Sequence, residues 1–421
     1  MQSFTFVFLL FLFAATATRL WLSLRQSQSV SEHRSAVPAA FADKISLQEH
    51  QKAADYTLAK GRLGQVDLML GLLMLLVWTL GGGLDWLVQA WSSMGWTPLL
   101  TGAAVILSLA LISAVLDMPV SLYRTFVLEE RFGFNKTTPQ TFVMDLLKGL
   151  ILSLVIGVPL IIFILWLMES AGSAWWIYAW LGLTAFSLLM TWAYPKFIAP
   201  LFNRFEPLEE GEVAERIEKL LTRTGFNSKG VFVMDGSKRS AHGNAYFTGF
   251  GKNKRIVFFD TLLKHLTPAQ IEAVLAHELG HFKRKHIIKG MILSVSMTFI
   301  GFAILAWLMN QAWFYTSLGV QESEPSNYIA LILFMLVSPV FTFFISPLLA
   351  LLSRKHEFEA DEFAAHQSSA AELIAALVGL YKENANTLTP DPLYSAFYDS
   401  HPPAAIRIAH LQRQGLPEIN E

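Results

Sequence analysis

Two histidines four residues apart, with a glutamate beside the first, are the strongest chemical signal in the sequence. His277, Glu278 and His281 stand in the stretch Ala-His-Glu-Leu-Gly-His, and Thr267 followed by Pro268 predicts a helix start just upstream. Helix positions i and i+4 share one face, so both imidazoles can bind one Zn²⁺ while the glutamate reaches the metal's water. The alternative is a pair of surface histidines in a charged helix.

A catalytic zinc site also needs a third protein ligand and an open position for water. A third histidine six residues after the motif is absent, because Ile287 occupies that position and His286 is out of register. A second helix can supply a glutamate instead: Glu357 and Asp361 share one helical face in an acidic run. We therefore expect Glu357 to be the third ligand and Asp361 to accept the second ring N–H of a ligand histidine. Taken alone, such a run is more typical of a solvated face.

The composition restricts the class of protein. Of 421 residues, 53% are hydrophobic and 15% charged, with a mean hydropathy of +0.42, whereas globular domains carry about 25% charged residues. This composition argues against a wholly cytosolic enzyme. The net charge of −1 gives no basis for nucleic-acid binding, and the lack of cysteine excludes disulfides, thiolate metal sites and cysteine nucleophiles.

Seven stretches are apolar and long enough to cross a bilayer, which takes about 20 helical residues. They are 3–24, 67–89, 98–119, 149–168, 174–195, 290–310 and 327–352. The first loosely resembles a signal peptide, but no Lys or Arg precedes Arg19, so we expect a retained helix. The sequence predicts an α-helical integral membrane protein with about seven transmembrane helices.

The positive charges predict the orientation. All 32 Lys and Arg residues fall in segments 19–66, 120–148, 196–289 and 354–421. The positive-inside rule places these segments in the cytoplasm and the N-terminus outside. The two longest are together large enough for one globular domain on the cytoplasmic side.

The expected division is a membrane domain with five spans at 1–206 and a zinc metallopeptidase domain at 207–421, interrupted by the spans 290–310 and 327–352. His281 lies just before the first of these spans and Glu357 just after the second. Both ligand-bearing helices are expected to continue into the membrane. The metal would then lie near the cytoplasmic membrane surface, which favours membrane-tethered substrates.

These residues resemble a known family, the type I CAAX prenyl endopeptidases, which are integral-membrane gluzincin zinc metalloproteases. The resemblance starts from the His-Glu-Leu-Gly-His motif and the Glu357 to Asp361 stretch. It extends to further blocks at 244–249, 254–257 and 260–263, and to His401-Pro402-Pro403 with Arg407. It implies that the cytoplasmic domain is a zincin-like α+β metalloprotease domain.

The resemblance implies further site residues. Asn244 and Ala245 would form an edge strand that pairs with extended substrate, although Asn244 also suits a turn. Apolar patterns predict short strands at 231–234 and 255–259. His401 would assist at the transition state and Arg407 would order acidic side chains or substrate; a helix cap and a surface ion pair are the alternatives.

The implied chemistry is peptide hydrolysis with one Zn²⁺ per chain, bound by His277, His281 and Glu357. Glu278 would take a proton from the attacking water and return it to the leaving amine. The expected partners are the lipid bilayer and a membrane-tethered peptide or protein, prenylated at its C-terminus if the family's substrate is shared. The family also implies a water-filled chamber enclosed by the seven helices.

Two other functions stay open. In a bacterium, prenylated substrates could be absent and quality control of membrane proteins would be the expected task. The enzyme would then reside in the inner membrane, and in a eukaryote in the endoplasmic reticulum. A metal transporter is disfavoured because the histidine motif lies in a charged, soluble-looking stretch.

Overall fold

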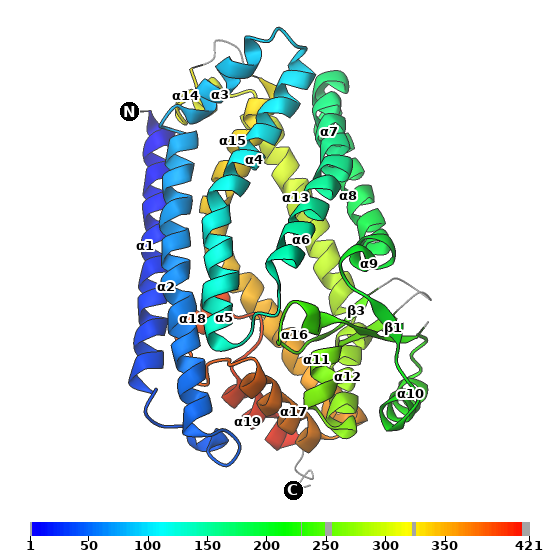
Figure 1. The fold of residues 1–421 in the computed structure, drawn as a ribbon. Coiled ribbons are helices and arrows are strands. Elements are labelled where there is room, and N and C mark those ends of the chain that lie inside the picture. The colour runs from blue at the N-terminus through cyan, green and yellow to red at the C-terminus, as the bar shows by residue number, and fades with distance from the viewer. Residues whose placement is uncertain (1, 229, 249–254, 322–325, 415–421) are drawn as a thin grey trace, which may run out of the picture.

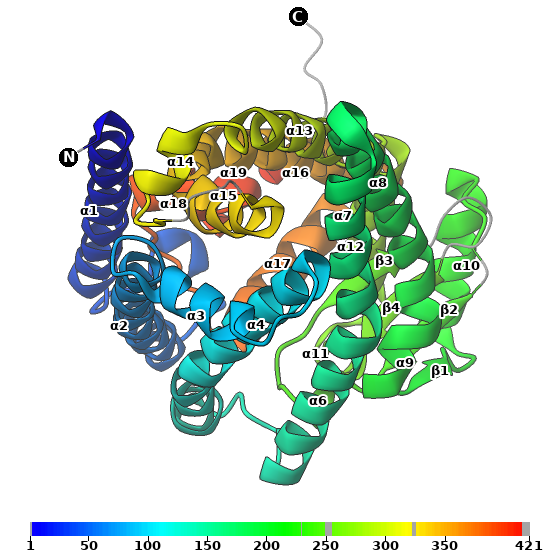
Figure 2. The ribbon, with the colours of Figure 1, turned by 90° about the horizontal axis from the view of Figure 1, so that it is seen from above.

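The computed structural model describes residues 2–228, 230–248, 255–321 and 326–414. Within these ranges seven segments are long and apolar enough to cross a membrane, which confirms the predicted number. They run side by side through the upper part of the molecule (Figure 1) and are arranged around a centre when seen from above (Figure 2). The segments are Ser3–Glu32, Leu47–Trp78, Pro98–Phe132, Pro139–Ser170, Gly172–Phe202, His286–Leu308 and Asn327–Gln367.

Several spans contain more than one helix. The first five contain α1 (Ser3–Glu32), α2 (Leu47–Trp78), α4 (Pro98–Tyr123), α5 (Glu130–Phe132), α6 (Pro139–Leu152), α7 (Val158–Ser170), α8 (Trp175–Ala193) and α9 (Ala199–Phe202), and the last two contain α13 (His286–Leu308), α15 (Asn327–Thr342) and α16 (Ser346–Gln367). Short π-helical or 3-10 turns join α4 to α5 (Arg124–Glu129), α6 to α7 (Ser153–Gly157), α8 to α9 (Tyr194–Ile198) and α15 to α16 (Phe343–Ile345). The helices α3 (Gly83–Ser92) and α14 (Ala312–Thr316) lie at the upper end (Figure 1).

The prediction of a second span at 67–89 was wrong at its C-terminal end. The helix begins at Leu47 and stops at Trp78, and residues 83–92 form the separate helix α3. The hydroxyl of Thr79 donates to the Leu75 carbonyl (2.6 Å), and Gly82 has a φ of 74°, which favours glycine. A Cβ on Gly83 would lie 2.7 Å from the Val77 carbonyl oxygen. The glycine run therefore turns the chain where hydropathy alone predicted a continuing helix.

A four-stranded sheet lies below the spans. Its order is β1 (Phe205–Pro207), β2 (Val231–Met234), β4 (Arg255–Phe259), β3 (Ala245–Thr248), with β2 and β4 parallel and the outer strands antiparallel to their neighbours. The predicted strands 231–234 and 255–259 are β2 and β4 with the predicted bounds. Strand β3 is an edge strand, as expected for Ala245. The sheet starts at Phe205, two residues before the expected domain boundary at 207.

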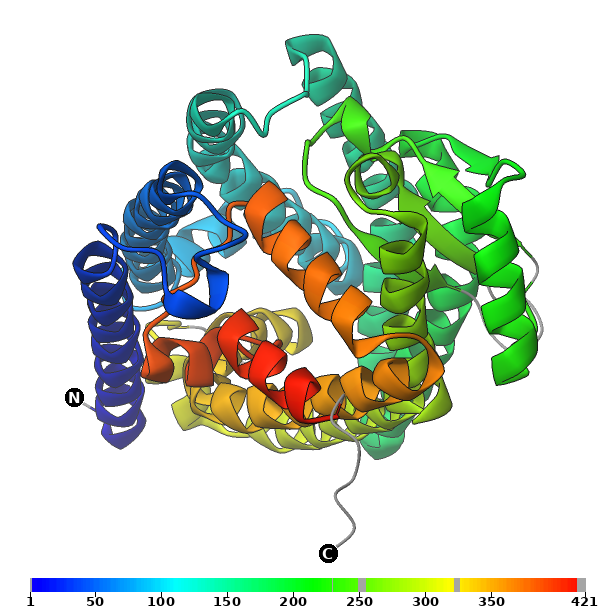
Figure 3. The same ribbon diagram turned by 90° about the horizontal axis from the view of Figure 1, so that it is seen from below.

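Helices cover the sheet and complete the lower half. They are α10 (Glu212–Thr224), α11 (Asp260–His265), α12 (Pro268–Lys283), α17 (Ala370–Glu383), α18 (Pro392–Tyr398) and α19 (Ala404–Gln414). One apolar core joins β4, α10, α12 and α17, and includes Phe258, Leu220, Leu275 and Leu373. Seen from below, α17 (orange in Figure 3) lies between α12 and α2 and contacts both.

The helix that carries the histidine motif begins where the sequence predicted. Thr267 caps α12 through Gln270: the Thr267 hydroxyl accepts from the Gln270 N–H, and the Gln270 side chain accepts from the Thr267 N–H. The expectation that this helix continues into the membrane was wrong. It ends at Lys283, and Lys285 has a φ of 58°, which changes the chain direction before α13 begins at His286. The second ligand-bearing helix, α16, does follow α15 through one 3-10 turn.

Helices α12 and α16 pack unusually closely, because a glycine faces an alanine at their contact. A Cβ on Gly280 would lie 2.9 Å from the Ala360 Cα, and the Ala360 side chain is fully buried. A larger residue at position 280 would push the helices apart. This contact places one turn of each helix within side-chain reach of the other, which determines the geometry of the site.

Candidate metal centre

Three side chains from α12 and α16 converge on one point. The Nε2 atoms of His277 and His281 lie 3.2 Å apart. Glu357 Oε1 lies 3.2 Å from His281 Nε2, and Glu357 Oε2 lies 3.5 Å from His277 Nε2. One ligand atom of each residue lies within 4.8 Å of the others. Glu357 Oε2 is buried and has no hydrogen-bond partner among the described residues. Two imidazole nitrogens and a buried carboxylate that face one another in this way fit a metal ion.

A buried carboxylate and a buried guanidinium lie on the Nδ1 side of His277. His277 Nδ1 lies 2.8 Å from Asp361 Oδ1, and Asp361 receives two bonds from Arg407, from Nε (2.8 Å) and Nη2 (2.5 Å). Arg407 also lies 3.5 Å from Glu357 Oε2. Asp361 and Arg407 are 0% and 5% exposed, so this ion pair is shielded from water and salt. The pair orients the imidazole with Nε2 directed at the metal position.

These charges also change the proton affinity of the histidine. Burial alone would lower the pKa of His277, but the contact with Asp361 and the nearby Glu357 carboxylate outweigh it and raise that pKa to about 9. In the adjacent position on α12, burial raises the pKa of the half-buried Glu278 carboxyl. A raised pKa makes a carboxylate a better proton acceptor.

His401 reaches the same group of residues from the loop before α19. Its Nε2 lies 3.4 Å from Glu357 Oε1, and its side chain is 61% exposed. The Ser400 hydroxyl lies 2.9 Å from His401 Nδ1. His401 therefore combines contact with a candidate ligand and access from solvent.

The two expected substrate-contacting residues lie at the open edge of the sheet. Asn244 directly precedes β3 and Ala245 begins it, and the Asn244 side chain accepts a hydrogen bond from the Ala245 N–H (2.8 Å). Among the described residues no hydrogen bond joins either of them to the candidate ligands His277, His281 and Glu357.

Comparisons with known proteins now decide the family. Residues 26–204 match the family described as CAAX prenyl protease N-terminal, five membrane helices, and residues 207–414 match peptidase family M48. A CAAX prenyl protease 1 homolog of Arabidopsis thaliana is 37% identical over 396 residues, covering 92% of each chain. The chain belongs to the CAAX prenyl protease family of M48 peptidases.

Two further relatives agree with this assignment. CAAX prenyl protease 1 of Saccharomyces cerevisiae is 34% identical over 422 residues, covering 93% of this chain and 91% of the yeast protein. The crystal structure of S. mikatae Ste24p matches 98% of this chain and 99% of its own, with a TM-score of 0.89 and 33% identity. The family resemblance, the membrane fold and the metalloprotease class predicted from the sequence are confirmed. The chain is a multi-pass membrane metallopeptidase rather than a metal transporter.

This M48 peptidase also has a second histidine cluster that the sequence pattern did not indicate. His281 Nδ1 lies 3.1 Å from His286 Nδ1, His286 Nε2 lies 2.9 Å from Glu359 Oε2, and the rings of His286 and His356 stack at 4.0 Å. His286 is out of register on a continuous helix. The left-handed Lys285 interrupts the helix and brings His286 toward His281, so this contact follows from the helix break and not from the spacing of the histidines.

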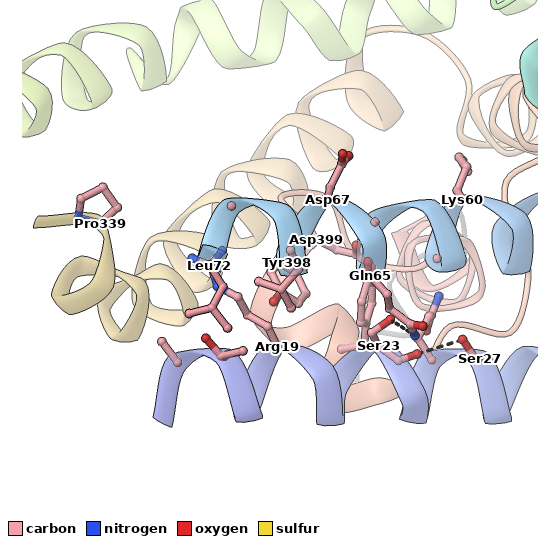
Figure 4. A pocket seen from close by; sticks show the side chains of 18 of the residues that line it. Arg19, Ser23, Ser27, Lys60, Gln65, Asp67, Leu72, Pro339, Tyr398 and Asp399 are labelled. Carbon is pink, nitrogen blue, oxygen red and sulfur yellow. Dashed lines mark hydrogen bonds between the residues drawn. The ribbon is translucent and has the colours of Figure 1, made fainter. Parts of the chain in front are cut away.

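A cavity of about 1110 Å³ extends from the site of this M48 peptidase into the membrane half. Leu12, Leu75 and Val340 line its apolar part, and Arg19, Asp399 and His401 line its polar part. Figure 4 shows Arg19, Ser23 and Gln65 on neighbouring turns of α1 and α2, where Gln65 donates to Ser23 (3.0 Å). The cavity therefore connects an apolar region among the spans with a residue that contacts the metal centre.

Proposed function

We propose that this chain is a zinc endopeptidase that cleaves membrane-tethered, C-terminally prenylated proteins. The observation that carries the proposal is the convergence of His277, His281 and Glu357 within 4.8 Å around a buried carboxylate oxygen that lacks a hydrogen bond. Two histidines and one glutamate are a known ligand set of catalytic zinc. One zinc ion per chain, held by these three residues, would supply Lewis acidity to a water molecule and to the scissile carbonyl.

Glu278 is the proposed general base. It follows the ligand His277 directly on α12, and its raised pKa suits proton transfer near neutral pH. In this role the carboxylate takes a proton from water as the water attacks the peptide carbonyl. The same carboxyl then returns the proton to the leaving amine, so no covalent intermediate is required.

Asp361, Arg407 and His401 complete the proposed site. Asp361 holds His277 in the tautomer that directs Nε2 forward, and Arg407 holds Asp361 through two bonds. His401 is exposed and borders Glu357, so its imidazole can donate a hydrogen bond to the oxygen that gains negative charge in the transition state. Asn244 and Ala245 would align the peptide backbone by strand addition.

Metal uptake is expected to depend on pH because a proton competes with the metal for His277. With a pKa of about 9, this imidazole is protonated at neutral pH when no metal is bound. Only the neutral form binds metal, so the apparent affinity should fall about tenfold per pH unit below pH 9 from this group. Competition with a chelator of known protonation, at several values between pH 6 and 9, measures the slope. A constant affinity over this range would contradict the assigned proton.

The charge distribution supports a cytoplasmic site, and the start of β1 at Phe205 supports a division just before that strand. The positive charges lie in the loops on the side of the sheet and the metal centre, and the turns at the other end carry none. The enzyme would then reside in the inner membrane of a bacterium or the endoplasmic reticulum membrane of a eukaryote, with the catalytic half facing the cytoplasm.

The cavity supports a lipid-modified substrate. Its apolar part, lined by Leu12, Leu75 and Val340, can hold a hydrocarbon chain while the attached peptide lies beside His401. The test compares a farnesylated CAAX peptide with the same peptide lacking the farnesyl group. We expect kcat/KM to be at least about tenfold higher for the farnesylated peptide, because buried CH₂ groups each contribute about 0.8 kcal/mol. Equal cleavage of both peptides would favour the quality-control protease instead.

A further inference from the structure

We propose that Asn384 is a positioning residue that closes one end of the substrate-binding edge of the sheet, so that a peptide pairs with β3 in one register. The inference rests on the proposed function, because it takes β3 as the strand that the substrate joins. Asn384 directly follows α17, far in sequence from the strand that it contacts.

The pairing of β3 with β4 determines which backbone N–H and C=O groups of β3 point away from the sheet. The Phe259 N–H donates to the Asn244 carbonyl (3.0 Å), so Asn244 turns its backbone toward β4, as does Tyr246 opposite Val257. The alternate residues Gly243, Ala245 and Phe247 therefore turn their backbone groups away from the sheet. An added strand would pair with these residues, and at Ala245 it would replace the Asn244 side chain, whose Oδ1 accepts from the Ala245 N–H (2.8 Å).

Asn384 already occupies the first of these three positions. Its Oδ1 accepts from the Gly243 N–H (3.1 Å), and its Nδ2 donates to the Gly243 carbonyl (3.3 Å). These two bonds are the ones that a residue of a neighbouring strand would make. A peptide that pairs with Ala245 and Phe247 cannot extend along the edge past Gly243 unless the carboxamide leaves.

The carboxamide is held in place by its surroundings. The Asn384 N–H donates to the Leu380 carbonyl (3.0 Å), and the next residue, Ala385, is 3% exposed with a φ of 45°. Asn384 Oδ1 also lies 3.3 Å from His242 Nδ1, and the His242 ring stacks on Phe134 at 4.2 Å. Displacing Asn384 would disrupt this packing as well as two hydrogen bonds.

The blocked position lies beside the cavity. Tyr381 and Asn386, on either side of Asn384 in the chain, both line the cavity that reaches His401. Asn384 therefore lies between two residues of the cavity lining, at the end of the proposed peptide path. This stop limits how many residues can lie on one side of the scissile bond, so it selects bonds at a fixed distance from a peptide end.

The test measures the effect of lengthening the substrate at each end. The probes are a farnesylated CAAX peptide and two versions of it, one with two alanines added at the C-terminus and one with two added at the N-terminus. For the wild type we expect one of the two extensions to lower kcat/KM about tenfold or more. This is the effect expected when a peptide must displace the two hydrogen bonds between the Asn384 side chain and the Gly243 backbone. In Asn384→Ala and Asn384→Ser this penalty should fall to about twofold.

Two further variants separate positioning from stability. Asn384→Asp keeps the acceptor for the Gly243 N–H and the size of the side chain but loses the Nδ2 donor to the Gly243 carbonyl, so we expect it to retain a penalty of about threefold, between those of the wild type and Asn384→Ala. Lys382→Ala removes the Lys382–Glu49 ion pair (2.9 Å) near the same helix end and should leave the ratio unchanged. A wild type without a penalty at either end, or an equal penalty in wild type and Asn384→Ala, would overturn the inference. Failure of every protein to cleave any peptide would instead overturn the proposed function.

Discussion

Replacing Glu278 with glutamine is expected to leave one metal ion bound per chain and to lower kcat for peptide cleavage by about 10²- to 10⁴-fold. Glutamine has nearly the same shape as glutamate but cannot accept a proton from water. The proposed metal ligands His277 and His281 contact Glu357 and Asp361, and these contacts do not involve the Glu278 carboxyl. Measured on the same preparation, the metal content should therefore stay at one ion per chain while the turnover falls.

The matched control for Glu278→Gln is Glu272→Gln on the same helix. Glu272 pairs with Arg216 (3.2 Å) and Arg223 (3.1 Å) away from the metal centre, so its replacement removes a carboxylate of α12 without removing the proposed base. We expect kcat for this control to stay within about twofold of the wild type, because a surface ion pair contributes about 0 to 1 kcal/mol. Cleavage at the wild-type rate by Glu278→Gln would assign the base to another residue.

The Glu357→Ala variant is expected to lose the metal. Removing a carboxylate that the metal uses directly should weaken affinity beyond the 10- to 100-fold loss that follows removal of an outer hydrogen-bond partner. It also leaves the buried Arg407 without one of its two carboxylate neighbours. Glu357→Gln keeps the side-chain volume and serves as the second variant. Dialysis against a metal buffer followed by elemental analysis measures the loss.

Glu359→Ala is the control for the ligand variant, since Glu359 lies two residues away on α16 and contacts His286 rather than the candidate ligands. We expect at most a 10- to 100-fold loss of metal affinity in Glu359→Ala, transmitted through His286 to His281. Unchanged metal content in Glu357→Ala would point to Glu359 or Asp361 as the third ligand.

The sequence could predict the spans and the shared face of the two motif histidines because both depend on short-range physical rules. A run of about 20 apolar residues has few stable alternatives to a membrane helix, and two histidines at i and i+4 share a face on any helix. The bounds of β2 and β4 followed from their apolar patterns for the same reason. Glu357 could be predicted as the third ligand only on the assumption that a second helix packs against the first.

The features that escaped prediction depend on where the chain turns. The glycines at 81–83 end α2 at Trp78, although the residues beyond them are as apolar as a span. The left-handed Lys285 ends α12 and brings His286 to His281, a contact that no helical periodicity contains. Gly280 was part of the recognised motif, but its contact with Ala360 could be found only once the packing of α12 on α16 was known. Asn384 bonds to Gly243, which lies 141 positions away in the sequence, and no local sequence pattern predicts a contact over that separation.

The zinc dependence of catalysis is tested most directly by cleavage of the farnesylated peptide with detergent-purified protein that has been stripped with a chelator and then titrated with zinc. We expect no cleavage by the metal-free protein and full recovery at one equivalent of zinc per chain, with no recovery in Glu357→Ala at that zinc concentration. Undiminished cleavage by wild-type protein verified to be free of metal would contradict this dependence.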